Sequence, residues 1–262
     1  MSNDIKYKRL SNLAVLLEEN PLAYYWMGFL MADGHFDKSK RIKFVLSQKD
    51  EHQVMRLASF VGFTGKIQRH KYYAGFSCQN VDIVPKLCAK FGIVSNKTEH
   101  PCKLDFAEDD LFLAAFIGFI DGDGCIKKVY KRKDAGIIIK CHRSWLPVLS
   151  YFNKRIQQIS KTTCNSNVIV NNAGYASINW TRGLLIRWLK SQSIRMKLPV
   201  LERKWNLIDL SLTSRQDVGE QRRIKIAELL QKGFSYKDIA RQIGITYSGV
   251  YMPQYRRRKG VL

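Results

Sequence analysis

The chain has 262 residues, and its 44 Lys and Arg against 22 Asp and Glu leave a formal net charge of +22. A hydrophobic content of 45%, which includes 13 Phe, 12 Tyr and 5 Trp, indicates a folded protein and excludes a disordered basic tail. Because so much positive charge strains a compact fold by self-repulsion, it favours a polyanionic partner. Nucleic acid is the first such partner to expect, ahead of an anionic membrane or packing within a ribosome.

Other classes of protein are excluded by the apolar runs and the cysteines. The longest apolar run, residues 111–120, is about half the length of a membrane-spanning helix, and the first ten residues lack the apolar core of a secretory signal. The six cysteines form no Cys-x-x-Cys pair, which excludes a zinc ribbon and a thioredoxin-type site. We expect a soluble cytoplasmic protein with reduced thiols and no membrane partner, in a bacterium or phage or, alternatively, in an organelle.

The first predicted helix covers residues 21–33. Asn20 and Pro21 suit its N-terminus, and Gly34 suits its end. The elements predicted after it are a strand over 41–48, a helix over 50–62, strands over 65–71 and 72–79, and a closing helix over 81–92.

The same order of elements recurs in the second part of the chain. Asp109 and Asp110 place acidic charge at the start of a helix over 109–121, where it suits the positive end of the helix dipole. The elements that follow are a strand over 136–142, a helix over 144–160, strands over 167–174 and 175–181, and a helix over 182–192. With the strand that opens each hairpin, we predict an α+β fold of two αββαββα halves, residues 1–104 and 105–212.

Both halves carry a similar nine-residue pattern at the end of the first helix. Residues 26–34 read Trp-Met-Gly-Phe-Leu-Met-Ala-Asp-Gly, and residues 116–124 read Phe-Ile-Gly-Phe-Ile-Asp-Gly-Asp-Gly. Each copy places two small residues four positions apart on one helix face, which allows two helices to pack closely. These small residues are Gly28 and Ala32 in the first copy, and Gly118 and Gly122 in the second.

If the two helices pack on each other, Asp33 and Asp123 meet at the same end of the pair. Two carboxylates at helix C-termini repel each other and face the negative end of the macrodipole, so they favour a bound cation. Oxygen ligands in small number suit Mg²⁺, which keeps several waters and takes phosphate oxygens as further ligands. A single Asp-Gly is commonly a helix end and a turn, but two copies followed by the same elements favour a functional site.

With these two nonamers, residues 10–210 resemble a LAGLIDADG homing endonuclease in its single-chain form. The resemblance implies a monomer in which the two motif helices meet at a pseudo-twofold axis and the two sheets lie in the major groove of double-stranded DNA. It also implies hydrolysis of phosphodiesters in both strands with Mg²⁺ or Mn²⁺, which leaves short 3′ overhangs, and a role in intron homing.

The resemblance carries metal binding over to the last aspartate of each motif. It implies Asp33 and Asp123 as the metal ligands, with the backbone carbonyls of Ala32 and Gly122 as helpers. The sequence departs from the motif at Met31, where the second copy has Asp121. Because that position is more often structural than catalytic, we expect the departure to affect a helix-end contact more than the chemistry.

The resemblance also implies further catalytic side chains around the metal ligands. Gln48 matches a polar residue that organises the attacking water, and His142 is expected to be its counterpart, with phosphate contact or simple exposure as alternatives. Lys97 and Lys197, each after a closing helix, match a basic residue near the scissile phosphate, where it stabilises developing charge. An ordinary DNA-backbone contact is the alternative for either lysine.

The predicted strands place polar side chains on alternating positions, as a two-stranded ribbon in the major groove requires. Plain solvent exposure fits such a face as well. The DNA-binding residues that we predict in the two halves are Lys43, Lys66, Gln68, Arg69, Lys71, Lys127, Lys128, Lys131, Arg132, Lys133 and Lys140.

The last part of the chain has a different composition. Residues 213–219 are predicted to be a linker, and residues 220–262 are predicted to be a helix-turn-helix domain with a capping box at Ser235 and Asp238 and a turn at Gly244. Pro253 departs from this pattern because proline ends or bends a helix. The residues expected to meet DNA are Tyr247, Ser248, Tyr251, Gln254, Arg256, Arg257 and Arg258, and the alternative is a packing module without DNA contact.

The sequence therefore predicts a site-specific, metal-dependent DNA endonuclease. The alternative is a binder of nucleic acid with the same fold that does not cleave, either an intron RNA maturase or a transcription regulator. Retention of both motif aspartates favours cleavage, and the predicted DNA-reading tail favours DNA over RNA.

Overall fold

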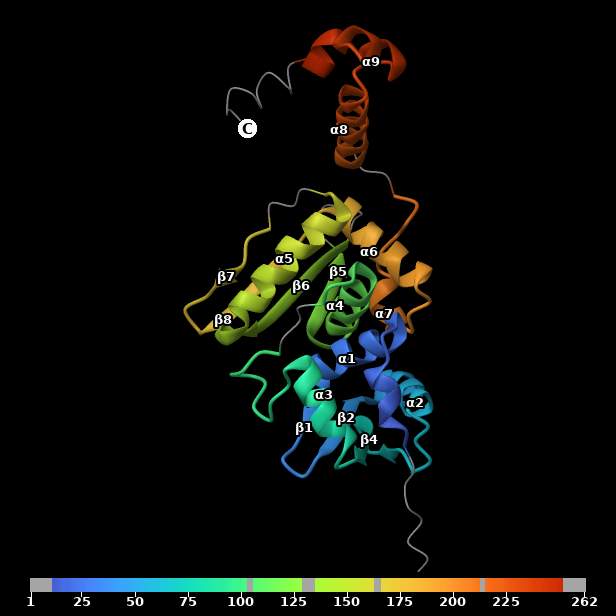
Figure 1. The fold of residues 1–262 in the computed structure, drawn as a ribbon, viewed down its shortest axis with the longest axis vertical. Helices are drawn as coiled ribbons and strands as arrows, with labels where there is room; N and C mark the ends of the chain where they lie inside the picture. Colours follow the sequence, from blue (N-terminus) through green and yellow to red (C-terminus); the bar gives the residue numbers. More distant parts are fainter. Residues whose placement is uncertain (1–10, 103–105, 129–134, 163–165, 213–214, 252–262) are drawn as a thin grey trace, which may run out of the picture. The chain divides into compact units, whose positions relative to one another are not determined.

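The computed structural model describes residues 11–102, 106–128, 135–162, 166–212 and 215–251 (Figure 1). The chain divides into two compact units, Met1–Leu210 and Ser211–Leu262. The first unit contains both predicted halves, which share one hydrophobic core.

The two halves have the predicted order of elements. Asn20 caps the first helix, since its side chain accepts a hydrogen bond from the backbone N–H of Ala23 at 2.9 Å. The first half contains α1 (Pro21–Asp33), β1 (His35–Phe36), β2 (Arg41–Ser47), α2 (Glu51–Phe60), β3 (Gln68–Arg69), β4 (Tyr73–Gln79) and α3 (Ile83–Phe91). The second contains α4 (Asp109–Asp123), β5 (Gly124–Lys128), β6 (Ala135–His142), α5 (Leu146–Ser160), β7 (Ile169–Val170), β8 (Tyr175–Trp180), α6 (Gly183–Arg195) and a short additional helix, α7 (Glu202–Trp205).

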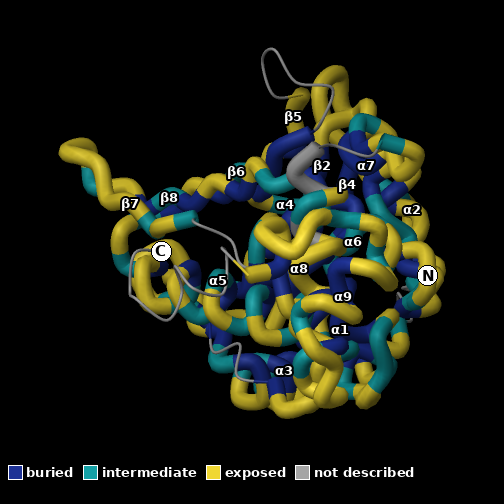
Figure 2. Tube along the Cα trace, turned by 90° about the horizontal axis from the view of Figure 1, so that it is seen from above, coloured by how far each residue is buried: buried dark blue, intermediate teal, exposed yellow. Residues whose placement is uncertain are grey.

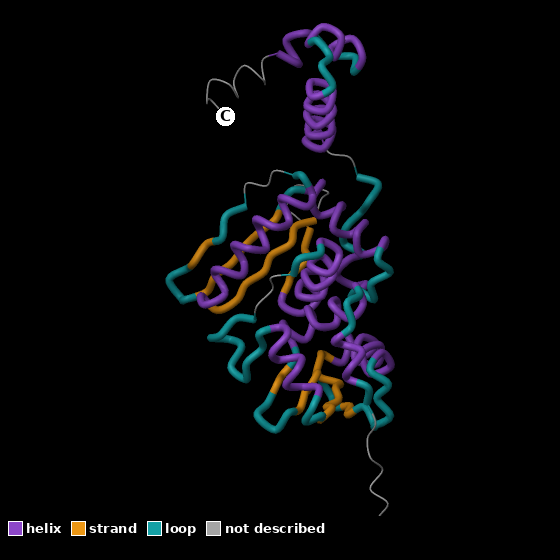
Figure 3. Tube along the Cα trace, in the orientation of Figure 1, coloured by secondary structure: helices purple, strands orange, loops and turns teal. Residues whose placement is uncertain are grey.

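Each half has one antiparallel sheet of four strands, drawn in orange in Figure 3. The strand orders are β1-β2-β4-β3 and β5-β6-β8-β7, so the two sheets have the same topology. Along β2, Ile42, Phe44 and Leu46 are buried in the core, while Arg41, Lys43 and Ser47 are exposed. One face of each sheet packs on helices, and the other, which we call the open face, carries polar side chains.

Helices α1 and α4 lie side by side between the two sheets (Figure 1). Both helices are apolar on all sides, which is typical of a buried helix. Figure 2 shows the buried positions of the chain in dark blue. A methyl group built on Gly28 would lie 1.9 Å from the carbonyl oxygen of Ala115, and one built on Gly122 would lie 2.2 Å from the Ala32 Cβ. The small residues of the two nonamers therefore permit the close approach predicted from their spacing.

The second unit has its own small core, formed by Ile226, Leu229, Ile239, Ala240 and Val250. These residues come from helices α8 (Arg215–Gln231) and α9 (Tyr236–Gln242) and from a helical turn that begins at Tyr247.

The predicted linker over residues 213–219 is wrong in its second part, because α8 already begins at Arg215. Gly219 disfavours helix, but the Arg, Gln and Glu around it are good helix formers and outweigh it. Among the described residues, no helix is long and apolar enough to cross a membrane.

Candidate functional site

Asp33 and Asp123 end α1 and α4 and lie at the same end of the helix pair. The contact between Ala32 and Gly122, the residues just before them, holds the two helix ends together. Both aspartates are exposed to solvent, although the surrounding protein atoms restrict the hydration of their carboxylates. Two acidic groups are therefore accessible from outside at the centre of the first unit.

The environment of these carboxylates opposes their ionisation. Burial among protein atoms, together with the nearby charge of Asp123, raises the pKa of Asp33 from its ordinary 3.8 to about 6. Burial also raises the pKa of Asp123, against the effect of the ammonium groups of Lys97 and Lys204. Two carboxylates that are difficult to ionise side by side are a suitable place for a cation.

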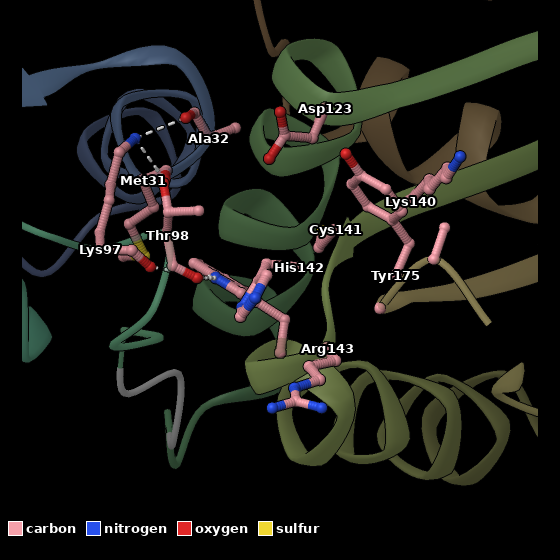
Figure 4. A pocket seen from close by; sticks show the side chains of 13 residues that line it. Met31, Ala32, Lys97, Thr98, Asp123, Lys140, Cys141, His142, Arg143 and Tyr175 are labelled. Atoms are coloured by element: carbon pink, nitrogen blue, oxygen red, sulfur yellow. Dashed lines mark hydrogen bonds between the residues drawn. The ribbon is translucent and has the colours of Figure 1, made fainter. Parts of the chain in front are cut away.

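Lys97 lies over the end of α1. Its ammonium nitrogen donates hydrogen bonds to the backbone carbonyls of Leu30 (3.2 Å), Met31 (2.7 Å) and Ala32 (2.5 Å), as Figure 4 shows for the last two. The carbonyl of Leu30 also accepts from the backbone N–H of Gly34 at 2.9 Å. Because the last turn of a helix presents the negative end of its dipole, a cation suits these carbonyls.

Lys204, and not Lys197, lies over the end of α4. Its ammonium nitrogen donates to the backbone carbonyls of Asp121 (2.6 Å) and Gly124 (2.6 Å), and also to those of Ile120 and Gly122 at 3.1 and 3.2 Å. Lys197 is exposed and has a left-handed backbone, with φ of 53°. Lys97 and Lys204 therefore occupy equivalent positions, over the ends of α1 and α4.

The expectation for Lys197 rested on equal spacing after the two closing helices. Lys97 follows the end of α3 by six residues, but Lys204 follows the end of α6 by nine, because the additional helix α7 carries it. The position of Lys204 between the apolar residues Leu201 and Trp205 was the only sequence signal for it.

The charge that lowers the pKa of each aspartate most comes from the lysine that covers the opposite helix. Asp33 feels the charge of Lys204 more strongly than that of Lys97, and Asp123 feels Lys97 more strongly than Lys204. We name these two groups the Asp33 site (Asp33 and Lys204) and the Asp123 site (Asp123 and Lys97). In both sites the aspartate and the lysine come from different helix ends.

The Asp123 site opens into a cleft of about 540 Å³ (Figure 4). Asp123 enters it from the end of α4 and faces Lys97 across it. The cleft is further lined by Met31, Ala32, Thr98, Lys140, Cys141, His142, Arg143, Trp145, Ala173, Gly174 and Tyr175.

His142 reaches this cleft, but it is not the counterpart of Gln48 in the sheet register. Ser47 pairs with Tyr73 and His142 pairs with Tyr175, so His142 corresponds to Ser47. Gln48 corresponds to Arg143, which is exposed and also lines the cleft. The first hairpin of the second half is longer than that of the first half. Counting residues from Asp123 therefore leads to His142, one residue before the position that the sheet register matches to Gln48.

His142 and Gln48 differ in their local contacts. The Nδ1 atom of His142 lies 3.1 Å from the Ser144 hydroxyl, which orients the half-buried imidazole. Gln48 is exposed just after β2, and its backbone N–H donates to the carbonyl of Tyr72 at 3.0 Å.

The two helix ends differ at one position of the nonamer, which is Met31 in the first half and Asp121 in the second. Met31 and Asp121 are both 1% exposed. Burial raises the pKa of Asp121 to about 6, against the hydrogen bonds that it accepts from Tyr25, Trp205 and the backbone of Leu201. Asp121 therefore makes structural contacts that the Met31 side chain cannot make.

The residues at the helix ends fit magnesium better than a metal enclosed by protein ligands. Among the described residues, no group of three or more His, Cys, Asp and Glu side chains is arranged to hold a metal. The carbonyls of Ala32 and Gly122, expected as helpers, already accept hydrogen bonds from Lys97 and Lys204. Two carboxylates, with waters and the phosphates of a substrate completing the shell, are the type of ligand set that Mg²⁺ uses.

The predicted DNA-binding residues of the strands lie on the surface. Lys43, Lys127 and Lys140 are exposed on the open faces, and the Lys140 ammonium lies 4.4 Å from the centre of the Tyr175 ring. Arg69 is exposed but forms an ion pair with Glu51 at 2.6 Å. Lys66, Gln68, Lys71 and Lys128 are exposed as well, and Lys131, Arg132 and Lys133 lie outside the described residues.

In the second unit, the N-cap expected at Ser235 and the turn expected at Gly244 are present, and Thr246 caps the turn that follows. The Ser235 hydroxyl accepts from the backbone N–H of Asp238 at 3.2 Å, Gly244 has φ of +66°, and Thr246 accepts from the backbone of Gly249 at 3.2 Å. Tyr247, Ser248 and Tyr251 are exposed, and the two tyrosine rings are stacked. Pro253, Gln254, Arg256, Arg257 and Arg258 lie outside the described residues.

Neither a protein-family model nor a curated protein matches this chain. Among solved structures, it is similar to the LAGLIDADG homing endonuclease I-GzeII in complex with its DNA target, with a TM-score of 0.51 and 11% identity over 86% of this chain and 97% of that one. It is also similar to a point mutant of I-SmaMI, with a TM-score of 0.50 and 12% identity over 81% of this chain and 92% of that one. The two αββαββα halves, joined at the helices that carry the nonamers, give this chain the LAGLIDADG homing endonuclease fold.

Proposed function

We propose that the chain is a site-specific endonuclease that cuts both strands of DNA with the help of divalent metal, Mg²⁺ or Mn²⁺. The observation that carries this proposal is the pairing of two exposed aspartates with two lysines at the centre of a fold that has two basic open faces. I-GzeII, which has the same fold, was solved in complex with its DNA target.

The open faces provide the DNA-binding surface. Exposed lysines of β2, β5 and β6 contact phosphates or base edges in the major groove, and alternation along the strands keeps them on one face. DNA that lies across both faces passes over the ends of α1 and α4. One scissile phosphate then lies at the Asp33 site and the other at the Asp123 site.

At each site the residues of the chain have separate tasks. The carboxylates of Asp33 and Asp123 hold the divalent metal, which supplies Lewis-acid activation of the attacking water and stabilises the leaving oxygen. Lys204 and Lys97 place an ammonium charge beside the phosphate, where negative charge grows as the bond breaks. Gln48 in the first half and His142 or Arg143 in the second orient the water from the sheet end.

Two sites offset across the minor groove cut the two strands at staggered positions, and short 3′ overhangs result. The chain acts as a monomer, because the two halves supply both sites. We assign the second unit as an accessory helix-turn-helix that lengthens the contact with DNA, because residues 215–262 hold 11 Lys and Arg against four Asp and Glu.

Linearisation of plasmid DNA tests the proposal. The plasmid carries the two DNA segments that flank the reading frame, joined to each other, because a homing target resembles the joined flanks. We expect Mg²⁺-dependent linear product with wild-type protein and none with Asp33→Asn/Asp123→Asn. Tight binding of the same DNA without a cut in either Mg²⁺ or Mn²⁺ would instead identify a binder that does not cleave.

A further inference from the structure

Lys97 and Lys204 occupy equivalent positions, but different neighbours hold them. Lys97 lies in the loop after α3, and neutral hydrogen bonds fix that loop to the second half. The indole Nε1 of Trp145 donates to the carbonyls of Lys97 (3.0 Å) and Thr98 (3.2 Å). Lys204, by contrast, lies within helix α7.

Asp121 anchors α7 at both of its ends. One carboxylate oxygen accepts from the backbone N–H of Leu201 (3.0 Å) and from the Tyr25 hydroxyl (2.8 Å), and the other accepts from the Trp205 indole (2.7 Å). Asp121 is 1% exposed, so water cannot replace it as an acceptor. Because Lys204 lies between Leu201 and Trp205, these bonds hold the turn from which its ammonium group reaches the carbonyls at the end of α4.

The first half has no carboxylate at the equivalent position. Met31 is buried there, and its apolar side chain accepts no strong hydrogen bond from the loop that carries Lys97. A change at Asp121 therefore reaches Lys204 through α7 and has no matching route to Lys97.

We propose that Asp121 is a positioning residue for Lys204 and that it thereby governs cleavage of one DNA strand only. This inference rests on the proposed endonuclease function. Asp121 does not contact the DNA, since it is buried beneath α7; it acts by holding the short helix that presents the lysine at the Asp33 site.

Asp121→Asn tests this positioning role, because Asn has nearly the same side-chain volume as Asp. The substitution converts one acceptor oxygen into an amide donor, so at least one of the three donors around it loses its partner. A displacement of about 1 Å at a catalytic group slows a reaction on the order of 100-fold. We expect the strand cut at the Asp33 site to be cut about 10- to 100-fold more slowly, and the other strand at a rate close to wild type.

Trp205→Phe is a milder second variant, because it removes one donor and keeps the aromatic packing. We expect it to slow the same strand by a smaller factor. Phe116→Leu is the matched control for stability, since Phe116 is buried in α4 against Phe152 and Trp180 and lies away from α7. It should leave the ratio of the two strand rates unchanged.

Strand-specific cleavage is measured in single turnover with a different fluorophore on each strand. Lys204→Ala identifies the strand that depends on Lys204. If Asp121→Asn slows that strand and leaves nicked DNA, the inference holds. Equal slowing of both strands would show that Asp121 supports only the fold, and the inference would be overturned.

Reactivity of the lysines tests the same inference without cleavage. Wild type and variants are treated briefly with an acylating reagent, and modification of each lysine is read by mass spectrometry. We expect Asp121→Asn to raise the modification of Lys204 several-fold and to leave Lys97 unchanged, whereas an equal rise at both lysines overturns the inference. If the labelling is selective but wild-type protein cuts no DNA, the proposed function fails and the positioning role stands.

Discussion

Gly118 lies directly against the backbone of Tyr25: a methyl group at Gly118 would come within 2.0 Å of the Tyr25 carbonyl oxygen. The contact joins α4 to α1, so the distance between the two halves depends on the absence of a side chain. The same small-residue face brings Asp33 and Asp123 together, and the geometry of both candidate sites follows from it.

Gly118→Ala should therefore destabilise the first unit by about 3 kcal/mol, because the backbone atoms that the new methyl meets cannot move aside as a flexible side chain would. The measurement is urea denaturation followed by tryptophan fluorescence. Gly219→Ala is the control: Gly219 lies in α8 with open space around it. The change should leave the tryptophan signal unchanged, because all five Trp lie in the first unit, and should stabilise the second unit, followed by circular dichroism, by about 0.5–1 kcal/mol. A neutral effect of Gly118→Ala would contradict the close helix contact.

Asp33→Asn should stabilise the metal-free protein, and more so at neutral than at acid pH. The pKa of Asp33 is about 6 in the folded chain against an ordinary 3.8, so the folded protein holds the proton more tightly than the unfolded chain. Stability contributed by this proton is present below about pH 4 and is lost as pH rises through about 6. The amide of the Asp33→Asn variant cannot ionise, so the variant escapes that loss.

Thermal unfolding in EDTA at pH 4.5 and pH 7.5 checks this pH dependence. We expect the gain in Tm from Asp33→Asn to be larger at pH 7.5. Saturating Mg²⁺ should raise the Tm of wild type at pH 7.5 and have little effect on Asp33→Asn/Asp123→Asn. A gain that is the same at both pH values would argue against charge repulsion at the helix ends.

The ion pair of Asp50 and Arg203 joins the first half to α7. Two guanidinium nitrogens of Arg203 donate to the carboxylate at 2.5 and 2.6 Å, and Asp50 is 4% exposed. Burial by itself would raise the pKa of Asp50, but the hydrogen bonds and charge of Arg203 outweigh it and hold that pKa below its usual value.

Arg203→Met should leave the Asp50 carboxylate buried without its ion-pair partner and lower the free energy of unfolding by about 2 kcal/mol. This loss is smaller than for a fully buried pair, because Arg203 is partly exposed. Asp50→Asn/Arg203→Met should recover part of the loss, since it removes the unpaired charge. Chemical denaturation of the two variants provides the comparison, and a double variant less stable than the single one would refute the account.

Removal of residues 213–262 should weaken DNA binding while the first unit remains folded and cuts its target. The two units are separately compact, and residues 215–262 carry a net charge of +7. Each phosphate contact that is lost should reduce the slope of log K against log salt by about one. Fluorescence anisotropy at several salt concentrations measures the slope, and an unchanged slope would show that the second unit does not contact DNA.

The sequence repeat allowed the architecture to be predicted, because helix pairs and alternating strands leave local periodic signals. The nonamers predicted both the contact of Gly28 and Gly118 with the opposite helix and the meeting of Asp33 with Asp123. Lys43 and Lys140 could be placed on an open face for the same reason, since alternation decides the side of a strand.

The contacts around α7 could not be predicted, because they join distant parts of the chain without any periodicity. Asp50 and Arg203 are 153 residues apart. Lys204 was missed because α7 adds residues after the closing helix that the first half lacks, so spacing pointed to Lys197. His142 was matched to Gln48 by counting, whereas strand pairing matches it to Ser47.

Selecting DNA for binding and then offering metal tests most directly whether Asp33 and Asp123 form a nuclease centre. DNA is first enriched from a random pool with wild-type protein in Ca²⁺, and the enriched sites are then incubated with the protein in Mg²⁺. We predict a cut in both strands with short 3′ overhangs, abolished by Asp33→Asn/Asp123→Asn while binding is kept. Selected sites that stay intact in Mg²⁺ and in Mn²⁺ would contradict the claim that Asp33 and Asp123 form a nuclease centre.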